Sequence, residues 1–252
     1  MKKGIVIVSF GTTYPGTRRK NIERITEQVR SIYPDAVIEE AVSSRTVRRI
    51  MKEREEIHAL DTGEALEALM KQGVTDAVVF ATHMIDGIEY HRVAEEAGKY
   101  KKDFEVLKIA KALLTEDKDY CAVAKAFWES VKNEVQSMPL ILMGHGTEHA
   151  ADVSYQKMEQ ALREYSNHAV YIATVEGSVT IDDVIGRMKA DKCVESGGEV
   201  MVMPFMLVAG EHANHDMAGE EESFSSKLKE AGYQPKCMIR GIGEYAAVRD
   251  IY

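Results

Sequence analysis

Three residues with side chains suited to metal binding follow apolar segments in the second half of the chain. His145 stands between two glycines, Glu176 follows the apolar run 169–175, and His212 lies in the segment GEHANHD. Two imidazoles and a carboxylate form a ligand set for a borderline divalent metal such as cobalt, iron, nickel or zinc. Because the three ligands would come from separate loops, the site would stay open to a substrate. The pattern predicts a site for catalysis or metal transfer.

His145 is the central residue of this prediction. Gly144 and Gly146 remove side chains on both sides of it and allow a sharp turn, so the imidazole can be presented to an approaching ligand. A histidine after a strand can also be a capping or hydrogen-bonded residue. A phosphate-binding turn is disfavoured, because the segment lacks G-x-G-x-x-G spacing and a following Lys-Thr or Lys-Ser. We therefore expect His145 to be a catalytic residue that handles a metal or a proton.

The other two candidates have simpler interpretations as well. Glu176 could be an ordinary loop acid. His212 and His215 are three residues apart, which places both on one face if the segment is helical. Only one of them need bind a metal, and His212 is preferred because it lies nearer the end of the preceding strand. His83 and His91 are weaker candidates in the first half.

The elements that would position these residues alternate regularly along the chain. Apolar, β-branched runs predict strands at 5–10, 36–42, 76–82, 105–110, 139–144, 169–175, 199–205 and 236–241. Apolar residues at helical spacing predict helices at 21–32, 65–71, 122–135, 155–163 and 181–188. This order indicates an α/β protein built of parallel sheets flanked by helices. The join between its halves is expected near 136–139, giving an N-terminal half of 1–137 and a C-terminal half of 138–252 that carries the metal ligands.

An internal repeat supports two related halves. VSFGTTY (8–14) resembles MGHGTEH (143–149), and two further landmarks recur in the same order. The alignment places Phe10 opposite His145, Ser43 opposite Glu176, and Glu89 roughly opposite His212. Loops after parallel strands gather at one edge of a sheet, where ligands bind. Two halves facing each other would place these loops in one cleft.

Composition limits the classes of partner. The chain has 252 residues, 45% of them hydrophobic, and a formal net charge of −9. This charge argues against a nucleic-acid partner and favours a cationic ligand. The three cysteines are far apart, the chain opens on a strand pattern rather than a leader, and no apolar run is long enough for a membrane span. We therefore expect a cytoplasmic protein with no membrane partner.

The chain resembles the anaerobic cobalt chelatases (CbiK) of the class II chelatase and ferrochelatase-like group. The resemblance covers most of the chain. Its most specific segments are the opening VSFGTTYPGTRRKNI, then HMIDGIEY, MGHGTEH, the TVEG loop and MPFMLVAGEHANHDMAGEE. The resemblance implies two Rossmann-like halves with a tetrapyrrole held between them. It also implies a metal bound by His145, Glu176 and His212, the set that the repeat predicts.

The implied activity is that of a lyase that inserts Co²⁺ into sirohydrochlorin, or a closely related precorrin, in the anaerobic cobalamin pathway. His145 would be ligand and proton acceptor, and Glu176 would hold the metal or relay protons. The resemblance implies neither a nucleotide nor a redox cofactor, and a homo-oligomer is compatible with it. Residues expected to contact the macrocycle are Phe10, Gly11, Thr12, Tyr14, Ser43, His83, Met84 and Glu89. Candidates for binding its carboxylates are Arg18, Arg19 and Arg45.

Two alternatives stay open at the level of sequence. The first is a tetrapyrrole or haem carrier in which His145 or His212 is an axial ligand and no metal is inserted. The second is a chelatase for nickel or iron, because imidazole and carboxylate ligands accept these metals too.

Overall fold

The computed structural model describes residues 2–252 and forms two compact units that divide between Thr115 and Glu116. The division falls before helix α6 (Asp117–Val135), whereas the sequence placed the join after it. The reason is packing, because the Phe127 ring on α6 lies 5.7 Å from the rings of both Phe205 and Tyr245. Helix α6 therefore belongs to the core of unit 2.

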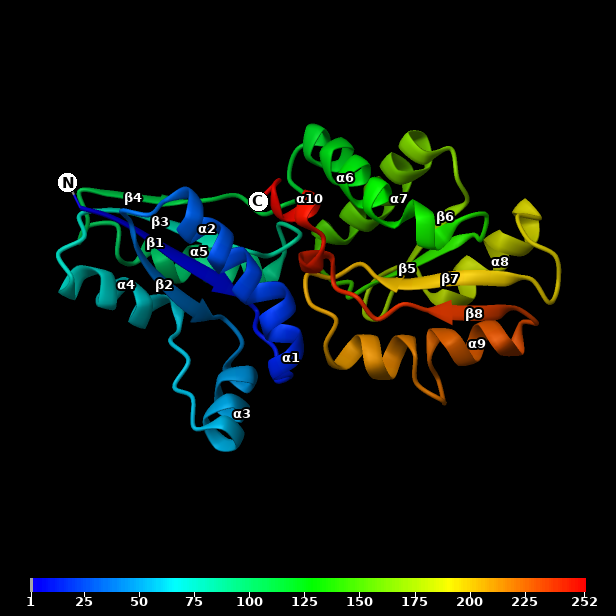
Figure 1. Cartoon of the computed structure of the whole chain (residues 1–252), viewed down its shortest axis with the longest axis horizontal. Helices are drawn as coiled ribbons and strands as arrows, with labels where there is room; N and C mark the ends of the chain where they lie inside the picture. The colour runs from blue at the N-terminus through cyan, green and yellow to red at the C-terminus, as the bar shows by residue number, and fades with distance from the viewer. Residues whose placement is uncertain (1) are drawn as a thin grey trace. The chain divides into compact units, whose positions relative to one another are not determined.

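The described part of unit 1 contains four strands and five α-helices. One or two of the helices lie between each strand and the next (Figure 1). The strands are β1 (Lys3–Ser9), β2 (Val37–Val42), β3 (Asp76–Ala81) and β4 (Val106–Ile109). The helices are α1 (Pro15–Arg18), α2 (Arg24–Ile32), α3 (Arg45–Glu55), α4 (Thr62–Lys71) and α5 (Ile88–Gly98), with a π-helical turn, η1 (Arg19–Glu23), between the first two.

Unit 2 follows the same plan. Its strands are β5 (Leu140–Gly144), β6 (Val170–Thr174), β7 (Glu199–Pro204) and β8 (Gln234–Cys237). Besides α6 it contains α7 (Val153–Ser166), α8 (Ile181–Asp191), α9 (Phe224–Glu230) and α10 (Ala246–Arg249). Shorter turns are η2 (Ala150–Asp152), η3 (Ala213–Met217) and η4 (Ile242–Glu244).

The two sheets have the same topology, which confirms the predicted fold class. Their strand orders are β2-β1-β3-β4 and β6-β5-β7-β8, and all pairs are parallel. A strand overlaps each of the eight predicted segments, although β8 shares only Lys236 and Cys237 with the segment predicted at 236–241. The backbone also repeats in detail, since Gly11 after β1 has φ +93° and Gly146 after β5 has φ +83°.

The strand register makes the sequence alignment of the repeats more specific. Ser9 pairs with Val42 in unit 1, and Gly144 pairs with Thr174 in unit 2. Counting two residues onward from Val42 and from Thr174 makes Ser44, rather than Ser43, the equivalent of Glu176 in the repeat. On the other side Val8 pairs with Ala81 and Met143 with Pro204. Counting eight residues onward from Ala81 and from Pro204 places Glu89 opposite His212, as the sequence alignment expected.

Each unit has its own buried core, and apolar side chains point from both faces of the central strands. In unit 2, Ile141 and Met143 pack in a cluster with residues of α8 and α9, while Leu140 and Leu142 are also fully buried. Figure 1 shows α6 and α7 on one side of this sheet and α9 on the other. A strand that is covered on both faces has apolar side chains in succession, and the continuous apolar segment LILM therefore predicted a strand of this kind. Within residues 2–252, no helix has the length and apolar character needed to cross a membrane.

Candidate active site

The backbone of unit 2 brings His145 and Glu176 side by side. The β5–β6 ladder continues past both strand ends, because the Val175 N–H donates to the Gly144 carbonyl (3.1 Å) and the Glu176 N–H to the His145 carbonyl (2.8 Å). The Oε2 atom of Glu176 lies 3.8 Å from Nδ1 of His145. Two of the three predicted ligands thus meet at the carboxyl edge of the sheet, where parallel strands present their loops.

Two glycines allow the ligand loops to approach closely. Gly146 has φ +83°, and a Cβ atom there would lie 2.3 Å from the Gly177 nitrogen. A Cβ atom on Gly177 would in turn lie 2.3 Å from a carboxylate oxygen of Asp152. Neither position accepts a larger residue without moving backbone or a buried side chain. The close spacing of His145 and Glu176 therefore depends on these glycines.

His212 completes the cluster. The rings of His145 and His212 pack edge to face, with centroids 4.7 Å apart and an interplanar angle of 88°. Nδ1 of His212 lies 2.6 Å from an Asp216 carboxylate oxygen, and Nδ1 of His145 lies 3.0 Å from the Gly146 carbonyl. Because both partners are acceptors, each Nδ1 is the donor, which leaves the lone pair of each histidine on Nε2. This is the tautomer that binds a metal through Nε2.

His212 directly precedes the π-helical turn η3, whereas His215 lies within it. His215 is 67% exposed in its side chain and lies 3.1 Å from Glu211, whereas His212 contacts Asp216 and the His145 ring. The wider turn of a π-helix changes which residues share a face. The structure thus brings His212, and not His215, to His145.

The cluster is open and does not yet form a closed ligand set. The side chains of His145, Glu176 and His212 are 42%, 61% and 36% exposed. Across residues 2–252, no three His, Cys, Asp or Glu side chains converge closely enough to hold a metal ion. The reason is local, because the two rings pack against each other and Glu176 approaches the Nδ1 side of His145. Rotation of exposed side chains would be needed for three donor atoms to converge.

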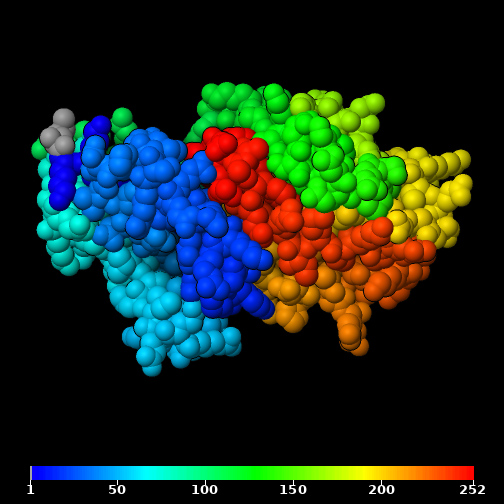
Figure 2. Space-filling view, viewed as in Figure 1, coloured from blue at the N-terminus to red at the C-terminus, as the bar shows by residue number. Residues whose placement is uncertain are grey.

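Unit 1 contains a groove of about 750 Å³ beside α3 and α5. It brings together three of the expected substrate-binding residues, Phe10, Ser43 and Glu89, with the candidate cation Arg45. Phe10 is 47% exposed, so an aromatic face is available to a ligand. Helix α3, with Arg45 at its start, lies away from the strands of unit 1 in Figure 1 and forms the cyan protrusion in Figure 2.

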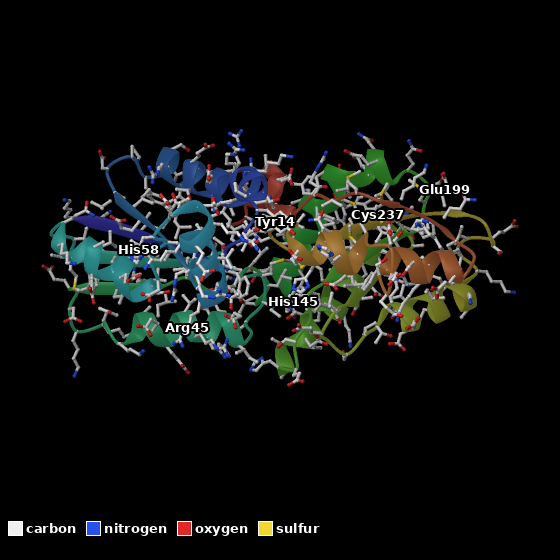
Figure 3. All side chains as sticks on the ribbon, turned by 90° about the horizontal axis from the view of Figure 1, so that it is seen from below. Tyr14, Arg45, His58, His145, Glu199 and Cys237 are labelled. Carbon is white, nitrogen blue, oxygen red and sulfur yellow. The ribbon has the colours of Figure 1, made fainter. Side chains whose placement is uncertain are left out.

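The cations around this groove differ in what they already bind. Arg48 donates to the Val42 carbonyl at 2.6 Å, and Arg92 and Lys99 pair with glutamates on α5. Arg18, outside the groove, makes two hydrogen bonds to the Glu55 carboxylate at 3.2 and 2.6 Å. Arg45, labelled in Figure 3, is exposed and has no ion pair within residues 2–252. It is therefore the groove cation most available to an anionic ligand.

The remaining expected substrate-binding residues do not line the groove. Gly11 forms the turn after β1, and buried Thr12 accepts a hydrogen bond from the Tyr14 N–H at 3.2 Å. The Met84 carbonyl accepts from the Leu114 N–H. Gly11, Thr12 and Met84 thus have structural roles in the loops that follow β1 and β3.

His83 lies behind the groove. Its Nε2 is 3.4 Å from the Ser43 hydroxyl, and its Nδ1 is buried without a hydrogen-bond partner in the described part of the chain. Burial lowers the pKa of His83 to about 4, because the protonated ring would be poorly solvated. The folded protein therefore holds His83 neutral at physiological pH.

This pKa predicts a pH-dependent stability. Between pH 6.5 and about 4, unfolded His83 binds a proton that the folded protein does not, so its contribution is fully present above pH 6.5 and lost as pH falls. We expect the difference in unfolding free energy between wild type and His83→Gln to shrink by about 2 kcal/mol from pH 7.5 to pH 5. Urea unfolding at both pH values measures it. A difference that stays constant with pH would contradict the prediction.

Sequence reasoning missed several residues that organise the cluster. Asp216 holds His212, while Asp152 and Tyr155 contact the His145 loop. A signal for Asp216 was present, since it lies four residues after His212, a spacing that joins side chains along one helical face. Asp152 gave none, because its partners are brought to it only by folding.

The protein has a duplicated α/β fold, with exposed His and Glu side chains near the strand ends of one unit. This combination of fold and site indicates the class of metal chelatases. A family model described as cobalt chelatase (CbiK) matches residues 3–252. The chain therefore belongs to the cobalt chelatase (CbiK) family.

Two relatives agree with this assignment, and one solved structure has a similar fold. The sirohydrochlorin cobaltochelatase of Salmonella typhimurium is 29% identical over 253 residues, covering 100% of this chain and 94% of the relative. The sirohydrochlorin cobaltochelatase CbiKC of Nitratidesulfovibrio vulgaris is 29% identical over 262 residues, covering 100% of this chain and 88% of the relative. SirB from Bacillus subtilis, solved with Fe³⁺, has a similar fold, with a TM-score of 0.70 at 17% identity, covering 100% of this chain and 92% of SirB.

Proposed function

We propose that this protein inserts Co²⁺ into sirohydrochlorin, and that His145, Glu176 and His212 bind the metal before transfer. The observation that carries the proposal is the cluster at the ends of β5, β6 and β7, in which His145 contacts both other side chains. Membership of the cobalt chelatase family and the names of the two relatives support the same activity.

The reaction exchanges one metal ion for two protons, because Co²⁺ replaces the two pyrrole N–H hydrogens of the free base. Each histidine in the cluster has its lone pair on Nε2, which can replace water on the metal. When Co²⁺ leaves for the macrocycle, the same lone pair on His145 becomes free to accept a pyrrole proton. Glu176 would supply the anionic ligand or relay a proton. No electrons are transferred, so this chemistry requires no redox cofactor.

One experiment tests the activity directly. Purified protein is mixed with sirohydrochlorin and Co²⁺, Ni²⁺ or Fe²⁺, and loss of the free-base absorbance is followed. We expect the rate with Co²⁺ to exceed the uncatalysed rate by orders of magnitude. If Ni²⁺ or Fe²⁺ is inserted faster than Co²⁺, that metal would be assigned as the substrate instead of cobalt. Binding of the macrocycle with no metal-dependent spectral change would identify a carrier and overturn the proposal.

We also propose that the groove of unit 1 contacts this substrate, with Phe10 and Ser43 near the macrocycle and Arg45 binding a carboxylate. Sirohydrochlorin carries several carboxylates, and a free guanidinium forms charge-assisted hydrogen bonds to such groups. An Arg45→Ala variant should raise KM for sirohydrochlorin by about 10- to 150-fold, the equivalent of the roughly 1.5–3 kcal/mol that a hydrogen bond to a charged group contributes, with kcat nearly unchanged. Steady-state kinetics with varied tetrapyrrole measures this.

The matched control for Arg45 is Arg49→Ala on the same helix. Arg49 pairs with Glu53 at 3.0 Å and is not among the residues that line the groove. Its variant should keep the wild-type KM. Equal KM values for Arg45→Ala and wild type would contradict the assignment of Arg45.

A further inference from the structure

One buried carboxylate ties together the two loops that carry His145 and Glu176. Asp152, 8% exposed at the start of α7, accepts a hydrogen bond from the Thr147 N–H through Oδ1 at 3.1 Å. Through Oδ2 it accepts from the N–H and the hydroxyl of Ser178, at 2.8 and 2.6 Å. The two oxygens of one side chain thus hold two separate loops.

The anchored positions have the same relation to the two ligands. Thr147 lies two residues after His145, and Ser178 lies two residues after Glu176. On the other side, each ligand follows its strand directly or by one residue, so each loop is fixed at both ends. Loss of Asp152 would remove these ties, leaving the Glu176 loop held by the Thr174 N–H, which donates to the Val179 carbonyl at 2.8 Å, and the His145 loop held by the Gly146 N–H, which donates to the Tyr155 hydroxyl at 3.3 Å. The distance between the imidazole and the carboxylate would then be less well defined.

Gly177 shows how closely this contact is fitted. A Cβ atom there would lie 2.3 Å from Oδ1 of Asp152 and 2.5 Å from the Thr174 hydroxyl. The backbone of the Glu176 loop therefore lies directly against the carboxylate. A flexible surface contact would not require a residue without a side chain.

The first half of the chain lacks this carboxylate. Gly11 corresponds to Gly146, and the following helical segments start at Pro15 and Ala150, so Thr17 occupies the position of Asp152. The half that has Phe10 in place of His145 thus has no carboxylate at the position that would join its loops. The contact occurs in the half that carries the histidine and the glutamate.

We infer that Asp152 is a positioning residue that holds His145 and Glu176 at the separation needed to bind Co²⁺ together. This inference rests on the proposed function for the identity of the metal. Asp152 itself does not contact the metal. It acts through the backbone of the two ligand loops, in the way that supporting contacts orient metal ligands elsewhere.

The test compares Co²⁺ binding and insertion kinetics in variants of the full chain. In Asp152→Asn the amide nitrogen must face either Thr147 N–H or Ser178, where a donor meets a donor, so one loop is released. We expect Kd for Co²⁺, measured by calorimetry, to rise by about 10-fold. KM for Co²⁺ should rise with it, while KM for sirohydrochlorin stays unchanged. Ser178→Ala removes only the hydroxyl contact and should raise Kd by about 2- to 3-fold.

Asp183→Asn is the matched control. Asp183 accepts hydrogen bonds from the N–H and hydroxyl of Thr180 at 2.8 and 2.6 Å, the same pair of contacts, but both belong to the start of α8. This variant should lose stability and keep the wild-type Kd for Co²⁺. It separates the loss of a folded-state contact from the loss of ligand position.

The outcomes distinguish this inference from the proposed function. Wild-type Kd in both Asp152→Asn and Ser178→Ala would overturn the inference, as would a lower melting temperature with no change in Kd. If Asp152→Asn fails to fold, Ser178→Ala decides by the same criterion. If the variants bind Co²⁺ more weakly than wild type, but wild type itself inserts no Co²⁺ into sirohydrochlorin, the inference is supported and the proposed function is refuted.

Discussion

A His145→Ala variant is expected to insert Co²⁺ into sirohydrochlorin about 10²- to 10⁴-fold more slowly than wild type, the range for loss of a proton-transfer group. His145 is the side chain that contacts both other proposed ligands, so its removal takes away one ligand and the link between the remaining two. Its side chain is 42% exposed, so truncation leaves no large cavity. Insertion rates from free-base absorbance, with the melting temperature as a check on folding, measure the effect.

His215→Ala is the control for this variant. His215 belongs to the same segment as His212 but contacts Glu211 at the surface. Its variant should insert Co²⁺ within about 2-fold of the wild-type rate, as expected for a surface substitution away from the site. An insertion rate in His145→Ala equal to that of wild type would refute the central role of His145.

A Gly146→Ala variant is expected to lose both stability and Co²⁺ binding. The backbone at Gly146 has φ +83°, which costs an L-residue about 1–2 kcal/mol, and the added methyl would lie 2.3 Å from the Gly177 nitrogen. Overpacking of this kind costs about 1–3 kcal/mol more. Because relief of the clash must move the Gly177 backbone, we expect Glu176 to shift and the Kd for Co²⁺ to rise. Chemical unfolding and calorimetry measure the two effects.

Gly73→Ala provides a control for backbone strain alone. Gly73 has φ +75°, but an added Cβ would meet no atom within 4 Å. Its variant should lose about 1–2 kcal/mol, the cost of backbone strain alone, with unchanged Co²⁺ binding. Equal losses of stability and equal Kd values in the two variants would show that the clash with Gly177 is relieved without moving the Glu176 loop.

The strands could be predicted because each is an apolar segment whose character is local. Strands covered on both faces, such as LILM in β5, require apolar side chains in succession, and no other element of that length does. Helix α3 was less visible, because only Val47 and Met51 are buried among its charged residues. The join between the units was placed after α6 instead of before it, since the partners of Phe127 on α6 lie about 80 and 120 residues further along the chain.

The candidate ligands could be proposed from sequence because the repeat identifies which loops occupy equivalent positions. The strand register then moved the first-half counterpart of Glu176 by one residue, to Ser44. A one-residue change in alignment cannot be resolved from weak similarity between two loops. It is fixed by hydrogen bonds between strands, which sequence does not display.

The sequence by itself determined the alternating α/β order, the duplication, and the association of His145, Glu176 and His212 with strand ends. The tertiary structure decided which side chains meet. It placed His212 rather than His215 against His145, and it joined two ligand loops through Asp152. Within the described residues it also left Arg45 without an ion pair, while Arg18 binds Glu55. The physical reason is that hydrophobic periodicity is a local property of one segment. A contact between side chains depends instead on backbone turns and on packing between segments that are distant in sequence.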